Sequence, residues 1–221
     1  MFPYPLVIFD LDGTLVDSAS DIAEALNGTL QELGLQQFPE ATVRSWIGEG
    51  VHTLLATALR EAGSDRDVDA EMPVMMRHYE ASLLHHPHLY PGVAEALPAL
   101  RSAGATLALC TNKPARFIQP LLEHLGIAAQ FATVLGGDSL PQRKPSAAPL
   151  LHLAQQFQHS PAQCLMVGDS ATDAAAAQAA GMPLAMVRYG YLSGFDVEHA
   201  RAVAVIDDLR ALLCLLFTSD A

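Results

Sequence analysis

Short apolar runs occur at three places in this chain, and each is followed at once by a cluster of polar residues. Runs this short, bounded by turn-forming residues, are typical of buried parallel strands. In an open α/β sheet, ligands bind beyond the carboxyl ends of such strands, so one crevice would collect all three clusters. Each run and its cluster are Leu6–Phe9 with Asp10-Leu-Asp12-Gly-Thr14, Leu107–Cys110 with Thr111-Asn112-Lys113, and Leu165–Val167 with Gly168-Asp169-Ser-Ala-Thr-Asp173. We predict that this crevice suits a divalent metal ion and a phosphate group.

The spacing of apolar residues divides the chain into two kinds of pattern. From Tyr90 onward, predicted helices and strands alternate, with a strand over Phe131–Leu135 and a last helix over Leu209–Phe217. This alternation indicates a parallel sheet with helices on both faces. Before His85 the pattern is helical only, and we interpret that stretch as a second domain inserted after the first strand. The helices expected there hold Ile22–Leu33, Val43 with Trp46 and Ile47, Val51–Leu59, and Met75–Leu83.

The composition limits the partners that this chain can bind. Asp and Glu number 24 against 12 Lys and Arg, and the net charge of −12 argues against nucleic acid or an anionic membrane as a partner. The N-terminus lacks the positive stretch of a signal peptide, and the apolar run Leu212–Phe217 is too short to cross a bilayer. The three cysteines are expected to be buried, reduced thiols. We therefore expect a cytoplasmic protein.

The residues of the three clusters can carry out phosphoryl transfer. A carboxylate such as Asp10 is ionised at neutral pH and can attack phosphorus to form an acyl phosphate. Charge opposes this step, because two unit charges about 4 Å apart repel by about 4 kcal/mol at an effective dielectric of about 20, and Asp169 adds negative charge. A Mg²⁺ ion bound by oxygen ligands would reverse the sign, and Lys144 would supply a second positive charge. Thr111 and Asn112 would hold the phosphoryl oxygens by hydrogen bonds.

The leaving group of such a reaction needs a proton, and Asp12 is the candidate acid. The same carboxyl group would then activate water against the acyl phosphate. Simpler interpretations exist, since Asp12-Gly13 alone is a common turn and Asp173 alone is a common helix N-cap. Because polar clusters follow three separate strands, a functional role for these residues is favoured over the simpler interpretations. In that interpretation Asp173 supports the metal ligands or touches the metal, and Thr14 supports the ligands from a second layer.

The segment from Asp10 to Ser18, Asp-Leu-Asp-Gly-Thr-Leu-Val-Asp-Ser, resembles the first motif of the haloacid dehalogenase superfamily of phosphatases. The remaining motifs of that superfamily are similar to Thr111-Asn112, Lys144-Pro145 and Gly168-Asp169-Ser-Ala-Thr-Asp173, in order and over nearly the whole chain. The resemblance implies an α/β fold with a Rossmann-like parallel-sheet core over residues 1–16 and 85–221 and a helical cap domain over residues 17–84.

The same resemblance implies a role for each matched residue. Asp10 would be the nucleophile, and Asp12 would be the general acid and base. The remaining roles would be Mg²⁺ binding by Asp10, Asp169 and the backbone carbonyl of Asp12, and phosphate binding by Thr111 and Lys144.

Further segments resemble the bacterial phosphoglycolate phosphatase family, which removes phosphate from 2-phosphoglycolate. They are Trp46-Ile-Gly-Glu-Gly50, Thr111-Asn-Lys-Pro114, Gly136-Gly-Asp-Ser-Leu-Pro141, Tyr189-Gly-Tyr191 and Val205-Ile-Asp-Asp-Leu209. Glu49 stands where that family usually has Asn. The turn Gly48-Glu49-Gly50 is expected to be either an ordinary turn or a lid loop that contacts substrate, so Glu49 bears on which ester is cleaved.

Several other functions stay open at this point. The expected partner is a small phosphomonoester, and the chain would act as a monomer or a homodimer. A sugar-phosphate phosphatase, a pyrophosphatase or a phosphomutase would use the same motifs, although a mutase must shield its aspartyl phosphate from water. A dehalogenase is disfavoured because that chemistry needs neither Asp12 nor a metal. A receiver-like signalling module would gather similar residues, but the helical insertion would then be unexplained.

Overall fold

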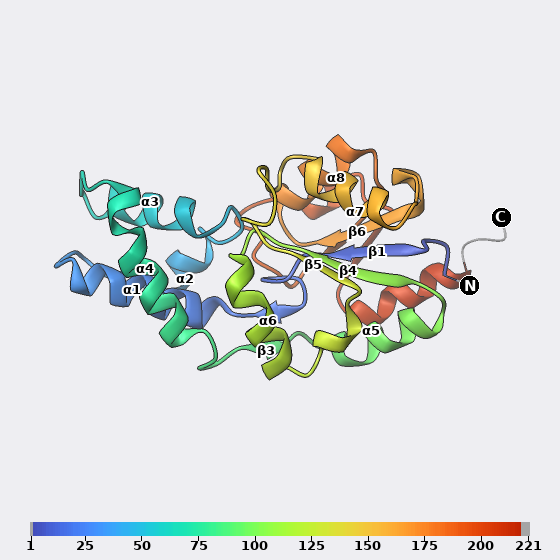
Figure 1. Ribbon diagram of the computed structural model, residues 1–221, viewed down its shortest axis with the longest axis horizontal. Coiled ribbons are helices and arrows are strands. Elements are labelled where there is room, and N and C mark those ends of the chain that lie inside the picture. Colours follow the sequence, from blue (N-terminus) through green and yellow to red (C-terminus); the bar gives the residue numbers. More distant parts are fainter. Residues whose placement is uncertain (1, 218–221) are drawn as a thin grey trace.

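The structure, a computed structural model, describes residues 2–217 and contains two sheets within that range. The larger sheet has six strands in the order β5-β4-β1-β6-β7-β8, and every neighbouring pair in it is parallel (Figure 1). The order turns around between β1 and β6, which makes these strands the switch point of a doubly wound sheet. This confirms the predicted α/β fold with a Rossmann-like core. The strands are β1 (Leu6–Phe9), β4 (Thr106–Cys110), β5 (Thr133–Leu135), β6 (Cys164–Gly168), β7 (Leu184–Val187) and β8 (Ala204–Ile206).

Helices cover both faces of this sheet, as the alternating pattern predicted. All four residues of β1 are buried, with Val7 and Phe9 in one apolar cluster and Leu6 and Ile8 in another, because successive strand residues point to opposite faces. Helices α5, α6 and η4 pack on the Val7 side, and α7 and α8 pack on the Leu6 side. The helices of the core are α5 (Val93–Ser102), α6 (Ala115–His124), α7 (Ala148–Gln156), α8 (Ala171–Ala180), and the 3₁₀ helices η1 (Ala128–Gln130), η2 (Pro161–Gln163), η3 (Val197–His199) and η4 (Leu209–Phe217).

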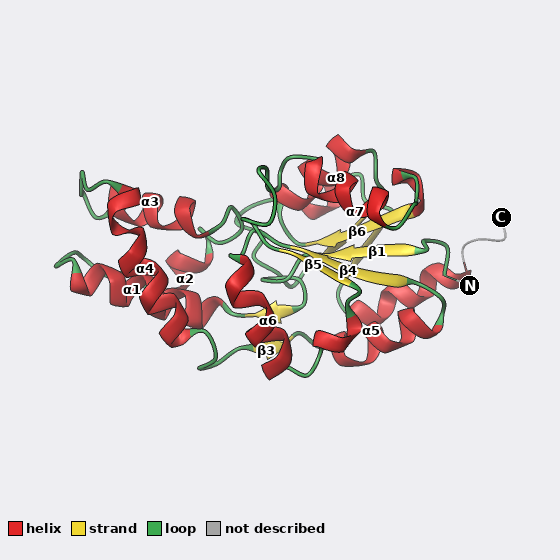
Figure 2. Ribbon diagram, viewed as in Figure 1, coloured by secondary structure: helices red, strands yellow, loops and turns green. Residues whose placement is uncertain are grey.

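A third apolar cluster lies beside the sheet, in four helices that we call the helical unit (Figure 2). Phe117 of α6 joins this cluster from the core. The chain leaves the core along β2 (Val16–Asp17) and returns along β3 (His88–Leu89), and these two strands pair antiparallel. Both strands lie close to the expected domain boundaries at 17 and 84, which stay a prediction, as does the role of the unit as a cap. The helical unit consists of α1 (Ala19–Glu32), α2 (Glu40–Arg44), α3 (Val51–Glu61) and α4 (Val68–Ser82).

Some local predictions were wrong. Helix α2 ends at Arg44, so Trp46 and Ile47 lie in a turn, where their N–H groups donate three residues back to the carbonyls of Val43 and Arg44. The last element, η4, is a 3₁₀ helix rather than an α-helix, and strand β5 begins two residues later than predicted. The edge strand β8 was not predicted, because three residues are too few to show a period.

The cysteine prediction holds in two cases out of three. Cys110 and Cys164 are buried, and burial raises the pKa of the Cys110 thiol to about 12. Cys214 is exposed, because it lies on the outer side of η4 while Leu209 and Leu212 face the core. Among the helices of residues 2–217, none combines the length and the apolar character needed to span a bilayer.

Candidate active site

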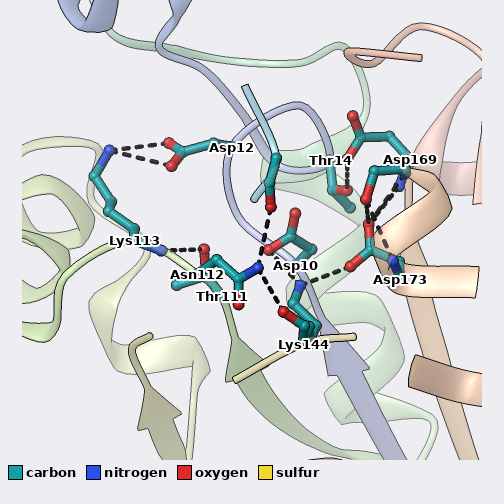
Figure 3. Close-up of polar contacts among 11 residues, drawn as sticks. Asp10, Asp12, Thr14, Thr111, Asn112, Lys113, Lys144, Asp169 and Asp173 are labelled. Atoms are coloured by element: carbon teal, nitrogen blue, oxygen red, sulfur yellow. Dashed lines mark hydrogen bonds and ion pairs between the residues drawn. The ribbon is translucent and has the colours of Figure 1, made fainter. Parts of the chain in front are cut away.

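Three neighbouring strands bring the predicted residues to one edge of the sheet. Asp10 follows β1, Thr111 follows β4, and Asp169 follows β6. All three side chains are buried, and Figure 3 shows them around a common space. Parallel strands end at the same edge, so residues far apart in the sequence become neighbours here.

An acidic cluster occupies one side of this space. Asp10, Asp169 and Asp173 each place a carboxylate oxygen there, and these atoms lie within 4.8 Å of one another. Burial raises the pKa of Asp10 to about 6, helped by the charge of Asp173 and opposed by Lys144. Burial and the two neighbouring carboxylates raise the pKa of Asp169 well above its ordinary value. The cluster therefore carries more negative charge than its protein partners offset, and its oxygen-only donors suit a hard divalent cation.

Hydrogen bonds hold two of these carboxylates in place. Asp169 accepts from the Thr14 hydroxyl at 2.9 Å and from the backbone N–H of Tyr191 at 2.6 Å. Asp173 accepts from the backbone N–H groups of Asp169 and Ser170 at 3.2 and 3.1 Å. Asp173 is thus the third residue of a capping box whose N-cap is Ser170, so the simple interpretation of Asp173 as an N-cap is wrong, while its place in the acidic cluster is confirmed.

The turn after β1 depends on glycine. Gly13 has a φ of +92°, a conformation that favours glycine. A Cβ atom at this position would lie 2.3 Å from Oδ2 of Asp169. The Asp12-Gly13 pair is therefore more than a surface turn, because its backbone packs directly against the acidic cluster.

Lys144 is the cation of the acidic cluster. Its Nζ lies 2.7 Å from Oδ1 of Asp10 and 2.6 Å from Oδ1 of Asp173, and its side chain is 2% exposed. Burial alone would lower the pKa of Lys144, but the two carboxylates outweigh burial and raise it. The ammonium group therefore stays charged beside the predicted nucleophile, where the sequence analysis expected a phosphate-binding cation.

Asn112 has a different set of contacts from the one predicted. Its Nδ2 donates to the carbonyl oxygens of Gly48 and Lys144, at 3.1 and 3.0 Å, so both amide hydrogens are in use. Its Oδ1 has no hydrogen-bond partner among the described residues. The predicted donation from this amide to phosphate is therefore not what the structure shows, because the amide ties the turn of the helical unit to the core. Thr111 is buried as expected, and its hydroxyl oxygen accepts from the N–H of Lys113 at 3.2 Å.

The carboxylate of Asp12 points away from the acidic cluster. It accepts from the Ser18 hydroxyl at 2.6 Å and from Nζ of Lys113 at 3.0 and 3.2 Å. Figure 3 shows this pair on the far side of the space from Asp169. The side chain of Asp12 therefore stands apart from the residues that could hold a metal, which leaves only its backbone carbonyl for the predicted metal contact.

A small cavity of about 40 Å³ lies between the core and the helical unit. Asp12 and Lys113 line it from the core, and Val51, Leu54 and Tyr79 line it from the helical unit. Of the predicted lid loop, Gly48 and Gly50 line this cavity. Glu49 does not, since its side chain is exposed and lines a separate groove beside Ser170. The expectation that Glu49 contacts the substrate is thus not supported by its position.

A profile of the family described as haloacid dehalogenase-like hydrolase matches residues 7–187. The chain belongs to this family. The match covers all the strand ends described above, and it confirms the resemblance found in the sequence. The protein is accordingly an enzyme of the haloacid dehalogenase-like family, and relatives that are 42% and 43% identical to it identify it as a phosphatase.

Relatives of this hydrolase cover nearly its whole length. It is 42% identical over 215 residues to the phosphoglycolate phosphatase of Nitrosospira multiformis, with 94% of each chain covered. It is 43% identical to the plasmid phosphoglycolate phosphatase of Cupriavidus necator, with 97% of this chain and 94% of the relative covered. A crystal structure of a predicted phosphoglycolate phosphatase from Haemophilus somnus superposes with a TM-score of 0.90 at 36% identity, covering 98% and 99% of the two chains.

No role was predicted for Lys113 of this hydrolase, although Lys113 lies in one of the three polar clusters. The composition of the chain nevertheless indicated that Lys113 is a candidate site residue. The chain has 12 Lys and Arg residues, of which only Lys113 and Lys144 are lysines. Lysine is common on protein surfaces and rarely buried unless paired, yet both lysines here are buried beside carboxylates. A chain that uses arginine for its surface cations makes each lysine a candidate site residue.

Proposed function

We propose that this hydrolase cleaves 2-phosphoglycolate to glycolate and phosphate through an aspartyl phosphate on Asp10, with Mg²⁺ as cofactor. The names of its relatives support the substrate. The observation that carries the mechanism is the separation of two carboxylates: Asp10 lies in the acidic cluster, whereas Asp12 lies two residues later against Lys113. One carboxylate is thereby available for attack and the other for proton transfer.

The residues present fit a divalent cation. Three buried carboxylates face a single ammonium group, Lys144, and burial, together with the neighbouring carboxylates, raises the pKa values of Asp10 and Asp169. Asp10, Asp169 and the backbone carbonyl of Asp12 would hold Mg²⁺, with Asp173 and Thr14 orienting them. When bound, Mg²⁺ supplies positive charge that offsets the repulsion between Asp10 and the phosphate dianion.

The side chains then divide the reaction into two transfers. In the first, an oxygen of Asp10 bonds to phosphorus, the bond from phosphorus to the glycolate oxygen breaks, and Asp12 gives its proton to that oxygen. In the second, water attacks the phosphorus of the aspartyl phosphate, Asp12 takes a proton from the water, and the carboxylate of Asp10 is released with inorganic phosphate. Lys144 and the hydroxyl of Thr111 would hold the phosphoryl oxygens during both transfers.

The lining of the cavity bears on the leaving group. Val51 and Leu54 supply an apolar wall, and Asp12 and Lys113 supply charged groups. Lys113 is the lysine that lines it, so a short anionic or polar group is better suited than a long apolar one. Glycolate meets both conditions.

A panel of phosphomonoesters, ranked by kcat/KM with Mg²⁺ and after chelation, tests this function. We expect 2-phosphoglycolate to rank first and chelation to remove activity. Acid quenching followed by borohydride reduction should convert Asp10 to homoserine, which mass spectrometry detects. If a sugar phosphate or pyrophosphate ranked first, 2-phosphoglycolate would be wrong as the proposed substrate. A requirement for a bisphosphate activator would indicate a mutase, and a stable phospho-Asp10 without turnover would indicate a signalling module.

A further inference from the structure

The hydrogen bonds of Lys113 join the core to the helical unit. Its Nζ donates to both oxygens of Asp12 and also to the hydroxyl of Tyr79, at 2.6 Å. Tyr79 belongs to α4 of the helical unit and is 3% exposed. The same Nζ lies 4.8 Å from the centre of the Tyr79 ring, beyond its hydroxyl edge, so the hydroxyl is the group of Tyr79 that contacts the ammonium group. The carboxylate of Asp12 and the hydroxyl of Tyr79 thus hold Lys113 Nζ from two different elements, which fixes the direction of the side chain.

This arrangement differs from two other polar contacts between the units. Asn112 donates to the carbonyl of Gly48, and the hydroxyl of Ser193 donates to the carbonyl of Ser45 at 2.8 Å. Neither contact continues to the carboxylate of Asp12. The path through Tyr79 and Lys113 ends on that carboxylate, so the position of the helical unit and the position of Asp12 are mechanically connected.

We propose that Lys113 is a positioning residue that holds Asp12 in place for proton transfer, and that Tyr79 fixes Lys113 only when the helical unit is seated over the site. This inference rests on the proposed function, because it takes Asp12 to be the general acid. It also explains why Lys113 is buried. Asp12 is held in position for proton transfer only when the helical unit lies against the core, so the proton is transferred only in the closed cavity.

Substrates with different leaving groups test whether Lys113 supports proton transfer to the leaving group. The value of kcat/KM reports on steps up to departure of the leaving group, and an alkoxide needs a proton whereas 4-nitrophenolate does not. The three substrates are 2-phosphoglycolate, 2-hydroxyethyl phosphate, which lacks the carboxylate, and 4-nitrophenyl phosphate. We expect Lys113→Met to lower kcat/KM roughly 10–100-fold on both alkyl esters and less than about threefold on the aryl ester. Tyr79→Phe should show the same pattern at roughly 3–10-fold.

Ser193→Ala is the matched control, since it also removes one hydroxyl bond between the two units but touches neither Lys113 nor Asp12. We expect it to change the three kcat/KM values equally and by less than about twofold. An equal loss on all three substrates in Tyr79→Phe and Lys113→Met would overturn the proposal in favour of a purely structural role. A loss on 2-phosphoglycolate alone would overturn it in favour of a contact between Lys113 and the substrate carboxylate.

Chemical labelling tests the connection without turnover. Because the chain holds only two lysines, acetylation by a water-soluble active ester and mass spectrometry can follow Lys113 and Lys144 separately. We expect Tyr79→Phe to speed labelling of Lys113 about tenfold and to leave Lys144 within about twofold of the wild type, since only the former loses a partner from the helical unit. Equal rates of Lys113 labelling in Tyr79→Phe and the wild type would contradict the proposal that Tyr79 fixes Lys113. If the wild type cleaves no alkyl ester, the proposed function fails, while labelling still decides whether Tyr79 fixes Lys113.

Discussion

The two sides of the active site are built in different ways. The acidic half consists of Asp10, Asp169, Asp173 and Lys144, which all come from the core: Asp173 from the first turn of α8 and the others from loops. The Asp12 half consists of Asp12, Lys113 and Tyr79, and the last of these comes from the helical unit. The acidic half is therefore complete whenever the core is folded, whereas the Asp12 half is complete only when the helical unit lies against the core.

The balance of charge differs as well. The acidic half sets three carboxylates against one ammonium group, and the pKa values of Asp10 and Asp169 are raised as a result of burial and mutual repulsion. The Asp12 half sets one carboxylate against one ammonium group. A divalent cation would balance the first half and has no counterpart in the second. The contrast suggests that the core alone prepares phosphoryl transfer, and that the helical unit prepares the departure of the leaving group.

The largest effect should come from removing the predicted nucleophile from the acidic half. Asp10→Asn keeps the shape of the side chain but cannot form the aspartyl phosphate, so we expect a loss in kcat of about 10⁴-fold or more, the scale seen when other enzymes lose a nucleophile. Steady-state assays with 2-phosphoglycolate measure the loss, and far-UV circular dichroism checks the fold. Normal turnover by a folded Asp10→Asn protein would remove Asp10 from the mechanism.

Loss of the cation from the acidic half should have the next largest effect. Lys144→Met removes one preorganised contact to the phosphoryl group, and we expect turnover to fall roughly 10²–10³-fold. The matched control is Arg60→Met, because Arg60 is an exposed cation whose salt bridge is to its neighbour Glu61. Arg60→Met should retain wild-type kcat. If Lys144→Met lowered kcat no more than Lys113→Met does, the contrast between the two halves of the active site would disappear.

Metal and pH should act on the acidic half together. In the metal-free fold the pKa of Asp10 is raised to about 6 from an ordinary value of 3.8, and that of Asp169 is also raised, so the folded chain binds protons more tightly than the unfolded chain. The contribution of these groups to stability therefore rises as the pH falls through about 6 and levels off below the unfolded pKa. Mg²⁺ binds the ionised carboxylates, so it should stabilise the protein at about pH 7.5 and much less near pH 5.

Thermal unfolding with Mg²⁺ and with chelator at both pH values measures this effect. Each kcal/mol corresponds to roughly 2–4 °C in Tm for a chain of this size. Asp169→Asn should lose the Mg²⁺-dependent rise in Tm, and Asp65→Asn, which changes an exposed carboxylate of the helical unit, should keep it. The same rise at both pH values would show that Mg²⁺ binds elsewhere.

The smallest effect is expected at Glu49, which lies in the turn of the helical unit but outside the cavity. Glu49→Gln removes one negative charge near the path of an anionic substrate, so kcat/KM should rise about twofold at low salt and return to the wild-type value at high salt. Glu61→Gln, at the far end of α3, is the control. A drop of more than about tenfold on every ester would mean that Glu49 contacts the substrate after all.

Much of the acidic half could be predicted from the sequence, because its signals are local. Asp10 follows its apolar run directly and Asp169 follows its run after one glycine, and parallel strands must end at one edge of the sheet. The position of the helical insertion was also visible as a change of period. The end of α2 was not, because the turn through Trp46 and Ile47 continues the apolar spacing of the helix without its hydrogen bonds.

The residues that cross between units were the ones that sequence patterns missed. Nothing in the spacing around Tyr79 distinguishes it from a core residue of α4, and nothing near Asn112 shows that the carbonyl of Gly48 would occupy its amide. These contacts depend on how α4 and the turn after α2 settle on the core, which is a matter of packing between surfaces distant in the chain.

By itself, the amino-acid sequence determined the doubly wound sheet, the three strand ends with their acidic residues and the inserted helices, because each of these follows from short-range periodicity and from the geometry of parallel strands. Only the tertiary structure decided which way the Asp12 carboxylate turns, that Lys113 meets it, and that Tyr79 completes the group. The physical reason is that a buried ammonium ion has low free energy only when its acceptors surround it, and those acceptors here come from segments that no local pattern connects.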